Sequence, residues 1–497
     1  MLRWTQRAPR LFLPLVGLAA LLTACSSTSE TPGPTDAGVN DASHPDTGAS
    51  SGSGGNGGNG GTGGAPVTPP GPDADWGMGS ETGSLEGDVW TPGRDENGLV
   101  NASSWALVPG GRWIEVNGTR LDGLDAEVKA QIPGWKDYGS GGWVAVTHAW
   151  NAPAVDPEGS RLWWVTAGGH GDSSNNGIYR FDAFRMTYAI EHLPSDTTKW
   201  SDGYKLLQTT NTFTSCAESS AEYNASVDAG TAEPAGGWFY DELFWDRQPT
   251  SRHTYSGAVY APKTDELVVP VRRLWRYSRA TGQWTYKRLA GDSATNNLGE
   301  EVIAAYDQYK DQVLIAACGS GGPWSDTFDM SGSKWTGEGT AWNGWDWNGA
   351  ADTRDGDVVT IFRTPEDPAN QYALEGRYAT FDVKEHKVVQ SGLVQYAGGL
   401  AASDFPFGDD GAGMVYVPPL NRYWVAVKDK SGSLAWFELD PTTTPAWTFG
   451  RMTAQAGAVP ALSSGSTVMR RRMIWMPKLH ALLFMGSADK NITLYRF

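Results

Sequence analysis

Short apolar runs recur along the chain from about residue 150 to the C-terminus. Each run follows a turn of polar residues, and a second polar or Gly-rich turn ends it. A polar turn before a short, continuously apolar run predicts a hairpin that leads into a buried β-strand. Six segments share this pattern: residues 157–169, 262–273, 309–320, 353–364, 419–430 and 477–489.

A further strand rich in Tyr and Phe is predicted after each apolar run, and a fourth strand, often with Trp, follows in most cases. Units of four strands that repeat every ~45–65 residues are typical of propeller blades. The sequence therefore predicts an all-β fold, a β-propeller of four-stranded blades. The aromatic third strands are predicted over residues 177–182, 273–278, 326–330, 377–383, 434–440 and 492–497.

The last unit ends after its third strand, at Phe497. Its missing strand has a counterpart within residues 104–118, which contain the run GRWIEV. We expect this N-terminal strand to complete the last blade, because such closure removes two open sheet edges. Six blades are favoured. Seven are the alternative, since an insertion at about residues 195–250 could hold a degenerate blade. A short helix is expected at residues 125–131.

Several units resemble kelch repeats, in which a Gly pair closes the second strand and an aromatic third strand follows. Gly168, Gly169, Tyr179 and Phe181 match this pattern in the first blade, and residues 281–284 match a blade end in the second. The resemblance implies a kelch-type propeller over about residues 100–497. It concerns the fold more than the function, because similar bacterial kelch proteins have no assigned activity.

Galactose-oxidase-type copper enzymes share the kelch propeller. Their site needs two Tyr and two His as copper ligands, with a Cys–Tyr crosslink. This chain has seven His, and they do not form that ligand pattern. The resemblance therefore implies a distantly galactose-oxidase-like propeller without the copper ligands, and we expect neither a metal nor another cofactor.

The N-terminus predicts an exported lipoprotein. Three arginines precede an apolar segment at residues 11–22, which is too short to span a bilayer, and the segment leads to Leu-Thr-Ala-Cys at Cys25. This ending resembles the bacterial lipobox, which implies lipidation of Cys25 and attachment to the membrane through the lipid. We expect a signal peptide at residues 1–24 and a cell-envelope location, with the outer membrane favoured.

Residues 25–75 are rich in Gly, Ser and Pro and hold almost no large apolar side chain, which predicts a disordered linker. The propeller is then expected to span residues 76–497. The formal net charge is −17, and removal of the signal peptide's arginines makes the chain more acidic. An acidic chain is a poor partner for nucleic acid, because phosphate binding needs a cationic face.

Two segments carry candidate ligand-binding residues. His170 and Asp172 lie in a Gly-rich turn and could bind a substrate hydroxyl or a cation, or they could cap the turn. Arg252, His253 and Tyr255 are expected to open a first strand, which in a propeller lines the central channel. They could bind an anion or a sugar there, or bridge neighbouring blades through loop carbonyls.

Trp342, Trp345 and Trp347 form a tight cluster whose rings could stack on sugars or pack within a long loop. Cys216 and Cys318 are the two thiols left once Cys25 is lipidated. A disulfide between them is expected in an oxidising compartment, with two unpaired thiols as the alternative.

No recognisable catalytic motif accompanies these candidates. We therefore expect a membrane-anchored binding or scaffold module for a glycan or a protein partner, displayed in the periplasm or at the surface. The alternative is a carbohydrate-active hydrolase or lyase that uses the mouth of the channel. Two carboxylates that converge on one pocket would favour the enzyme.

Overall fold

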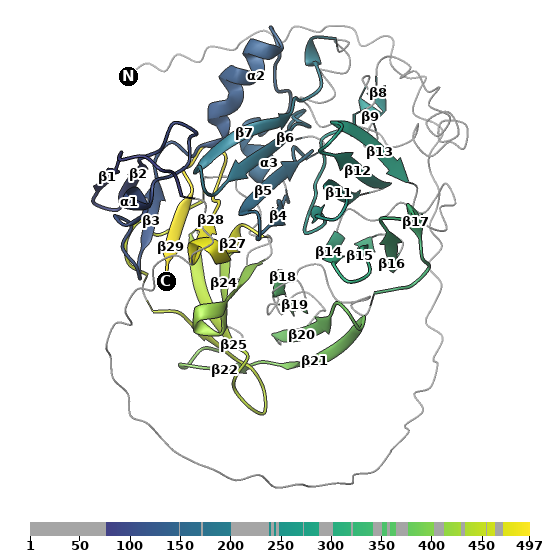
Figure 1. Cartoon of the computed structure of the whole chain (residues 1–497). Coiled ribbons are helices and arrows are strands. Elements are labelled where there is room, and N and C mark those ends of the chain that lie inside the picture. The colour runs from purple at the N-terminus through teal and green to yellow at the C-terminus, as the bar shows by residue number, and fades with distance from the viewer. Residues whose placement is uncertain are drawn as a thin grey trace, which may run out of the picture. The chain divides into compact units, whose positions relative to one another are not determined.

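The structure is a computed structural model, and part of the chain is described in it. Six sheets of this part surround one axis, and each of these six contains four consecutive antiparallel strands (Figure 1). This is a six-bladed β-propeller, which confirms the predicted fold class and excludes the seven-bladed alternative. The described residues are 76–148, 150–169, 172–199, 248–271, 273–287, 302–319, 322–340, 350–354, 358–363, 376–401, 412–428, 433–453, 455–462 and 471–497, with the backbone of residues 238–239 and 243–244.

The blades follow one another along the chain, and the first strand of each lies nearest the axis. Blade A contains β4 (Ala154–Asp156), β5 (Arg161–Val165), β6 (Ile178–Asp182) and β7 (Thr187–His192). Blade B contains β10 (Val259–Ala261), β11 (Glu266–Val271), β12 (Arg273–Ser278) and β13 (Gln283–Lys287). Blade C contains β14 (Val302–Asp307), β15 (Gln312–Gly319), β16 (Gly322–Asp329) and β17 (Lys334–Trp335).

The other three blades repeat this plan, and blades E and F have additional strands at their outer edges. Blade D contains β18 (Ala350–Arg354), β19 (Val358–Arg363), β20 (Arg377–Asp382) and β21 (Lys387–Leu393). Blade E contains β23 (Ala412–Val417), β24 (Arg422–Lys428), β25 (Leu434–Asp440) and β26 (Thr448–Arg451), and β22 (Gln395–Tyr396) pairs with β26 in parallel. Blade F contains β27 (Met473–Met476), β28 (Ala481–Phe484), β29 (Thr493–Arg496) and β3 (Trp113–Val116).

Both ends of the propeller sequence meet in blade F. The antiparallel ladder between β29 and β3 places Leu494 opposite Ile114. The predicted closure by an N-terminal strand is therefore confirmed, although the strand is shorter than residues 104–118. Its first part is helical instead, because α1 (Ala102–Trp105) turns there and buries Trp105. A parallel strand β2 (Val89–Pro92) and its hairpin partner β1 (Gly83–Glu86) extend the sheet beyond β3.

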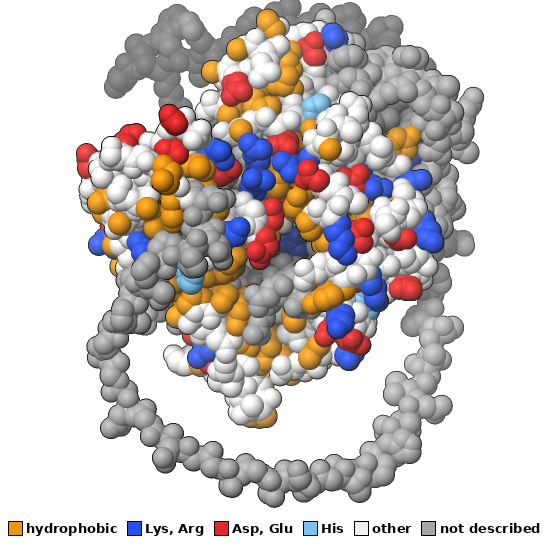
Figure 2. Space-filling model, in the orientation of Figure 1, with side chains coloured by type: hydrophobic (Ala, Val, Ile, Leu, Met, Phe, Trp, Pro, Cys, Tyr) orange, Lys and Arg blue, Asp and Glu red, His pale blue; other side chains and the backbone are white. Residues whose placement is uncertain are grey.

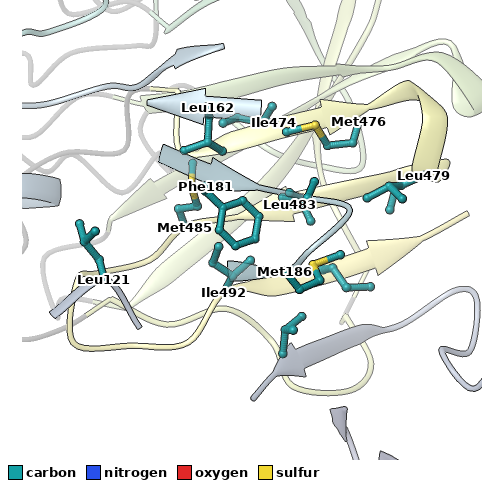
Figure 3. Packing of buried hydrophobic residues seen from close by; sticks show 14 of the residues in the cluster. Leu121, Leu162, Phe181, Met186, Ile474, Met476, Leu479, Leu483, Met485 and Ile492 are labelled. Carbon is teal, nitrogen blue, oxygen red and sulfur yellow. The ribbon is translucent and has the colours of Figure 1, made fainter. Parts of the chain in front are cut away.

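The apolar cores lie between neighbouring blades, because both faces of each sheet are covered. Separate clusters join blade A to F, A to B and C, C to D, D to E, and E to F, so packing runs around the whole ring. Figure 3 shows the contact that joins the first blade to the last, where Leu162 and Phe181 lie near Leu483 and Met485. Burial of such side chains stabilises a fold by about 1.5–3 kcal/mol each.

The turn between the first two strands has the same length in five blades. Four residues separate β4 from β5, β10 from β11, β14 from β15, β23 from β24 and β27 from β28. The last residue of each turn is left-handed, with φ between 47° and 54°. Asp and Asn tolerate this conformation better than most residues, which explains their place at the end of three turns. These five residues are Ser160, Asp265, Asp311, Asn421 and His480.

Helical segments cover blade A before its first strand. They are η1 (Leu121–Leu124), α2 (Asp125–Gln131) and α3 (Trp143–His148), so the short helix expected at 125–131 is present. Within the described part of the chain, every helix is too short or too polar to cross a bilayer.

Candidate functional site

A cavity of about 370 Å³ opens at the centre of the ring, at the end where the first strands enter their hairpin turns. We call it the cup. In four blades its wall carries an aromatic side chain from the same place, the last but one residue of the first strand. These residues are Tyr260, Tyr306, Tyr416 and Trp475, and Val155 holds the place in blade A. Figure 2 shows the ring hollowed at its centre, with a basic side chain in the depth and acidic side chains beside it.

The tyrosines of the cup are held by the turns that follow them. The hydroxyl of Tyr260 donates to Asp265 at 2.9 Å, and that of Tyr306 donates to Asp311 at 2.7 Å. In each case the acceptor is the left-handed residue five positions later. Burial, and then the hydrogen bond to Asp265, raises the pKa of Tyr260 to about 12. The hydroxyl therefore keeps its proton at neutral pH, and the bond fixes the direction of the ring.

The same device recurs in blade E, where the hydroxyl of Tyr416 lies 2.6 Å from Oδ1 of Asn421. In blade F the ring of Trp475 lies edge-on to His480, with centroids 6.3 Å apart. Aromatic rings therefore take fixed directions around the cup in four blades. Side chains fixed in this way lose little conformational freedom when a ligand binds.

Three charged residues line the cup. Arg471, which precedes β27, reaches across the channel and donates to the carbonyls of Ala258 at 3.3 Å and Ala304 at 2.8 Å. It thus links blade F to blades B and C at the inner end of the cup. Asp156 and Glu158 stand on the wall that blade A provides. Asp156 also accepts a hydrogen bond from the amide of Gly159 at 2.9 Å.

Residues predicted as ligands come together at the opposite end of the channel. Nε2 of His253 lies 3.7 Å from Oδ2 of Asp172, so the two predicted segments are adjacent in space. The imidazole is buried, and it lies edge-on to Trp150 with ring centroids 4.9 Å apart. Trp150 and Tyr255 both have positive φ, 51° and 48°, which is unusual for bulky residues.

Arg252 lies in the same segment and is buried. Its guanidinium donates to the carbonyl of Thr250 at 3.0 Å and to that of Val271 at 3.1 Å, and it lies 5.1 Å from the ring centroid of Trp275. These contacts tie the segment to blade B. The expectation that residues 252–255 open a first strand is wrong, because β10 begins only at Val259 and the left-handed Tyr255 interrupts the extended backbone.

A buried polar cluster surrounds this end of the channel. Asn151 donates to the carbonyls of Ala145 and Ala167, and its Oδ1 accepts from the amide of Thr254 at 2.8 Å. The guanidinium of Arg472 donates to the carbonyls of Gly486 and Thr147. We call Asn151, Arg252, Thr254 and Arg472 the polar cluster. Its bonds hold the connections between blades in place.

Two titratable groups next to the polar cluster have shifted pKa values. Burial, and then the nearby Arg472, lowers the pKa of His148 to about 3, so its ring is neutral at pH 7. Burial raises the pKa of Asp137 to about 6, although Ser173 donates to its carboxylate at 2.7 Å. Both groups belong to segments that pack under the loops of blade A.

Other predicted residues lie outside the described residues, and their assignments stay predictions. They are Cys25, His170, Cys216, Trp342, Trp345 and Trp347. Cys318 lies in β15, opposite Pro323, but its side chain is not among those described. Within the described ranges, His, Cys, Asp and Glu do not gather in groups of three that could hold a metal ion.

The aromatic residues of the cup were missed by the sequence reasoning, although the sequence contains a signal for them. An aromatic residue stands five positions before the last residue of four first turns, as in Tyr260-Ala-Pro-Lys-Thr-Asp265. The predicted blade pattern rests on the apolar second strands, whereas this spacing lies in the first strands and the turns after them. Aligning the turns rather than the strands would have found it.

Comparisons with known proteins give similarity at the level of the chain trace only. No family model matches the chain, so its kelch resemblance stays a prediction. No curated protein matches either. Among solved structures, hydrazine synthase of Kuenenia stuttgartiensis is 10% identical, with a TM-score of 0.33, over 67% of this chain and 73% of that one.

Two other solved structures are similarly distant. The GH74 enzyme of Niastella koreensis is 12% identical, with a TM-score of 0.35, over 72% of this chain and 49% of that one. The β-propeller domain of the Trilobed protease from Pyrococcus furiosus is 7% identical, with a TM-score of 0.24, over 48% of this chain and 62% of that one. The TM-scores of these three structures are below 0.5, so no function follows from these similarities.

Proposed function

We propose that the propeller is a carbohydrate-binding module of the cell envelope and that the cup receives the sugar. The observation that carries this proposal is the set of aromatic side chains at equivalent positions around one cavity. Aromatic rings offer apolar faces on which sugar rings stack, and Tyr and Trp add polar edges. A cavity of about 370 Å³ falls within the range of small-molecule sites.

The polar groups of the cup, like its aromatic side chains, suit a neutral, hydroxylated ligand. Asp156 and Glu158 offer acceptors for sugar hydroxyls at the wall. The tyrosine hydroxyls donate to their turn residues and so fix the directions of rings that line the cavity. A site of this kind is already arranged before the ligand arrives, which favours affinity.

Binding is favoured over hydrolysis by the position of the carboxylates. Glycosidases place two carboxyl groups on either side of the bond that they cleave. In the described lining of the cup, Asp156 at the end of β4 and Glu158 in the turn that follows stand on one wall. The other described walls carry aromatic and aliphatic side chains together with Gln308 and Arg471.

The envelope location rests on the N-terminal pattern, in which an apolar segment leads to Cys25. A lipid on Cys25 and a Gly-rich linker would hold the module near the membrane while it binds a glycan. Cys25→Ser should give a protein that no longer fractionates with membranes. A variant that stays membrane-bound with unchanged mobility would contradict the lipid anchor and leave the glycan proposal intact.

The glycan proposal is tested with the full-length protein and a panel of oligosaccharides, by calorimetry and by the fluorescence of its tryptophans. We expect binding that Trp475→Ala weakens at least tenfold, because the ring is lost from the wall of the cup. The matched control is Trp284→Ala, which removes a half-buried Trp from the outer strand β13. Equal affinity in both variants would place the sugar elsewhere, and no binding by any member of the panel would overturn the proposal.

A further inference from the structure

In the described lining of the cup, the acidic side chains stand on one wall, that of blade A. Asp156 ends β4, and Glu158 follows it in the exposed turn before β5. No Lys, Arg or His of the described chain lies within 4 Å of either carboxylate, and the polar contact shown by Asp156 is with the amide of Gly159. Two carboxylates on one wall of a cavity, without a paired cation, attract a positive ligand group.

The aromatic walls add to this attraction. Tyr306 and Trp475 face the same cavity from blades C and F. Faces of Trp and Tyr rings attract ammonium groups, with Trp the strongest. An ammonium group in the cup would therefore meet carboxylates on one wall and aromatic faces on others, whereas a neutral sugar would use the carboxylates only as hydrogen-bond acceptors.

Arg471 decides which way such a ligand points. Its guanidinium sits at the inner end of the cup, where it donates to the carbonyls of Ala258 and Ala304. A positive charge there repels an ammonium group from the depth of the cavity. The amine must then lie toward the mouth, beside Glu158, while the hydroxylated part of the ligand lies deeper.

We propose that the cup selects glycans that carry a free amino group, such as oligomers of 2-amino-2-deoxyglucose. This inference rests on the proposed function and narrows it from sugars in general to amino sugars. Its chemistry is the attraction of one ammonium group by Asp156, Glu158 and the aromatic walls.

The test compares three tetrasaccharides on the full-length protein by calorimetry at about pH 5.5. They are the glucosamine tetramer, its N-acetylated form and cellotetraose. We expect the glucosamine tetramer to bind at least tenfold more tightly than the other two, with an advantage that shrinks as salt is added.

The double variant Asp156→Asn/Glu158→Gln should remove the advantage, so that the glucosamine tetramer binds no more tightly than cellotetraose. Asn at position 156 can still accept the hydrogen bond from Gly159, so the turn is preserved. Glu338→Gln, at an exposed position in the loop after β17, is the matched control and should keep the advantage.

The outcomes separate the two proposals. Equal binding of the three tetrasaccharides overturns the amine preference and leaves the carbohydrate-binding proposal standing. Absence of binding by all three overturns both. Equally tight binding of Nα-acetyl-lysine amide shows that the cup recognises an ammonium group without a sugar, which overturns the inference in favour of a basic protein side chain.

Discussion

The two ends of the channel use their polar atoms differently. At the cup, Tyr260 and Tyr306 bind turn residues of their own blades, and their rings remain on the wall of a cavity. At the other end, Asn151 and Arg252 donate to backbone carbonyls and are buried. The first arrangement leaves a surface that a ligand can touch. The second satisfies polar groups that burial would otherwise leave without hydrogen bonds.

Two consecutive arginines mark the boundary between these ends. Arg471 lies in the wall of the cup and is half-buried, whereas Arg472 is fully buried within the polar cluster. The chain turns at Arg471, whose backbone is left-handed with a φ of 45°, and these neighbours in sequence reach different ends of the channel. Charged and polar residues of the polar cluster thus stabilise the fold, while the repeated aromatic residues form the accessible surface of the cup.

The largest effect is expected from opening blade F, on which both ends depend. Deletion of every residue up to Gly118 removes β3 and exposes β29 as a free edge. We expect that the protein no longer unfolds cooperatively, which calorimetry measures. We also expect that it aggregates, which light scattering measures. Deletion of residues 26–75 alone should leave the melting temperature unchanged. Equal stability of the two truncations would contradict closure by β3.

The next effect compares the two arginines directly. Arg472→Met should destabilise the protein by about 3 kcal/mol, because the carbonyls of Gly486 and Thr147 lose their buried donor. Arg471→Met should cost less, since that side chain is only partly buried. Urea denaturation measures both changes. A larger loss of stability for Arg471→Met than for Arg472→Met would contradict the conclusion that Arg472 supports the fold and Arg471 lines the cup.

His148, which lies next to the polar cluster, should also make the stability of the protein depend on pH. Its pKa is about 3 in the folded protein and about 6.5 in the unfolded chain, so only the unfolded state gains a proton between these values. The contribution of His148 to the free energy of unfolding is complete above pH 6.5. As the pH decreases from 6.5, this contribution is lost by up to about 1.4 kcal/mol per pH unit.

His148→Gln should flatten this part of the profile of unfolding free energy against pH. Asp137 acts in the opposite direction, because its raised pKa stabilises the fold below pH 6. Subtracting the variant's profile from that of the wild type cancels the contribution of Asp137. Parallel profiles between pH 4 and 6.5 would show that the imidazole is not the neutral, buried group described here.

The smallest effect concerns the device that fixes the rings of the cup. Tyr306→Phe removes the hydroxyl that donates to Asp311 and should lower stability by about 1 kcal/mol. Tyr495→Phe is the control, because in the described structure that hydroxyl makes no hydrogen bond. Thermal unfolding distinguishes the two. A loss of stability for Tyr495→Phe as large as that for Tyr306→Phe would contradict a stabilising role for the hydrogen bond between Tyr306 and Asp311.

The blade plan could be predicted because it rests on local patterns. Apolar runs, polar turns and aromatic third strands follow from strand geometry and turn chemistry, which act over a few residues. Even the closure of the ring could be inferred, since the last unit stops at Phe497 and a matching strand lies near residue 113. Each of these features depends on sequence alone, or on one missing partner.

The site could not be predicted in the same way, because it is formed by residues from different blades. Tyr260 and Trp475 meet around one cavity only when the ring is closed, and nothing local says that Arg471 crosses to Ala258. The same holds for His253 and Asp172, which the sequence marks separately and the fold places 3.7 Å apart. Residue identity determined the possible chemistry, whereas the curvature of the ring determined which side chains face a cavity and which are buried between blades.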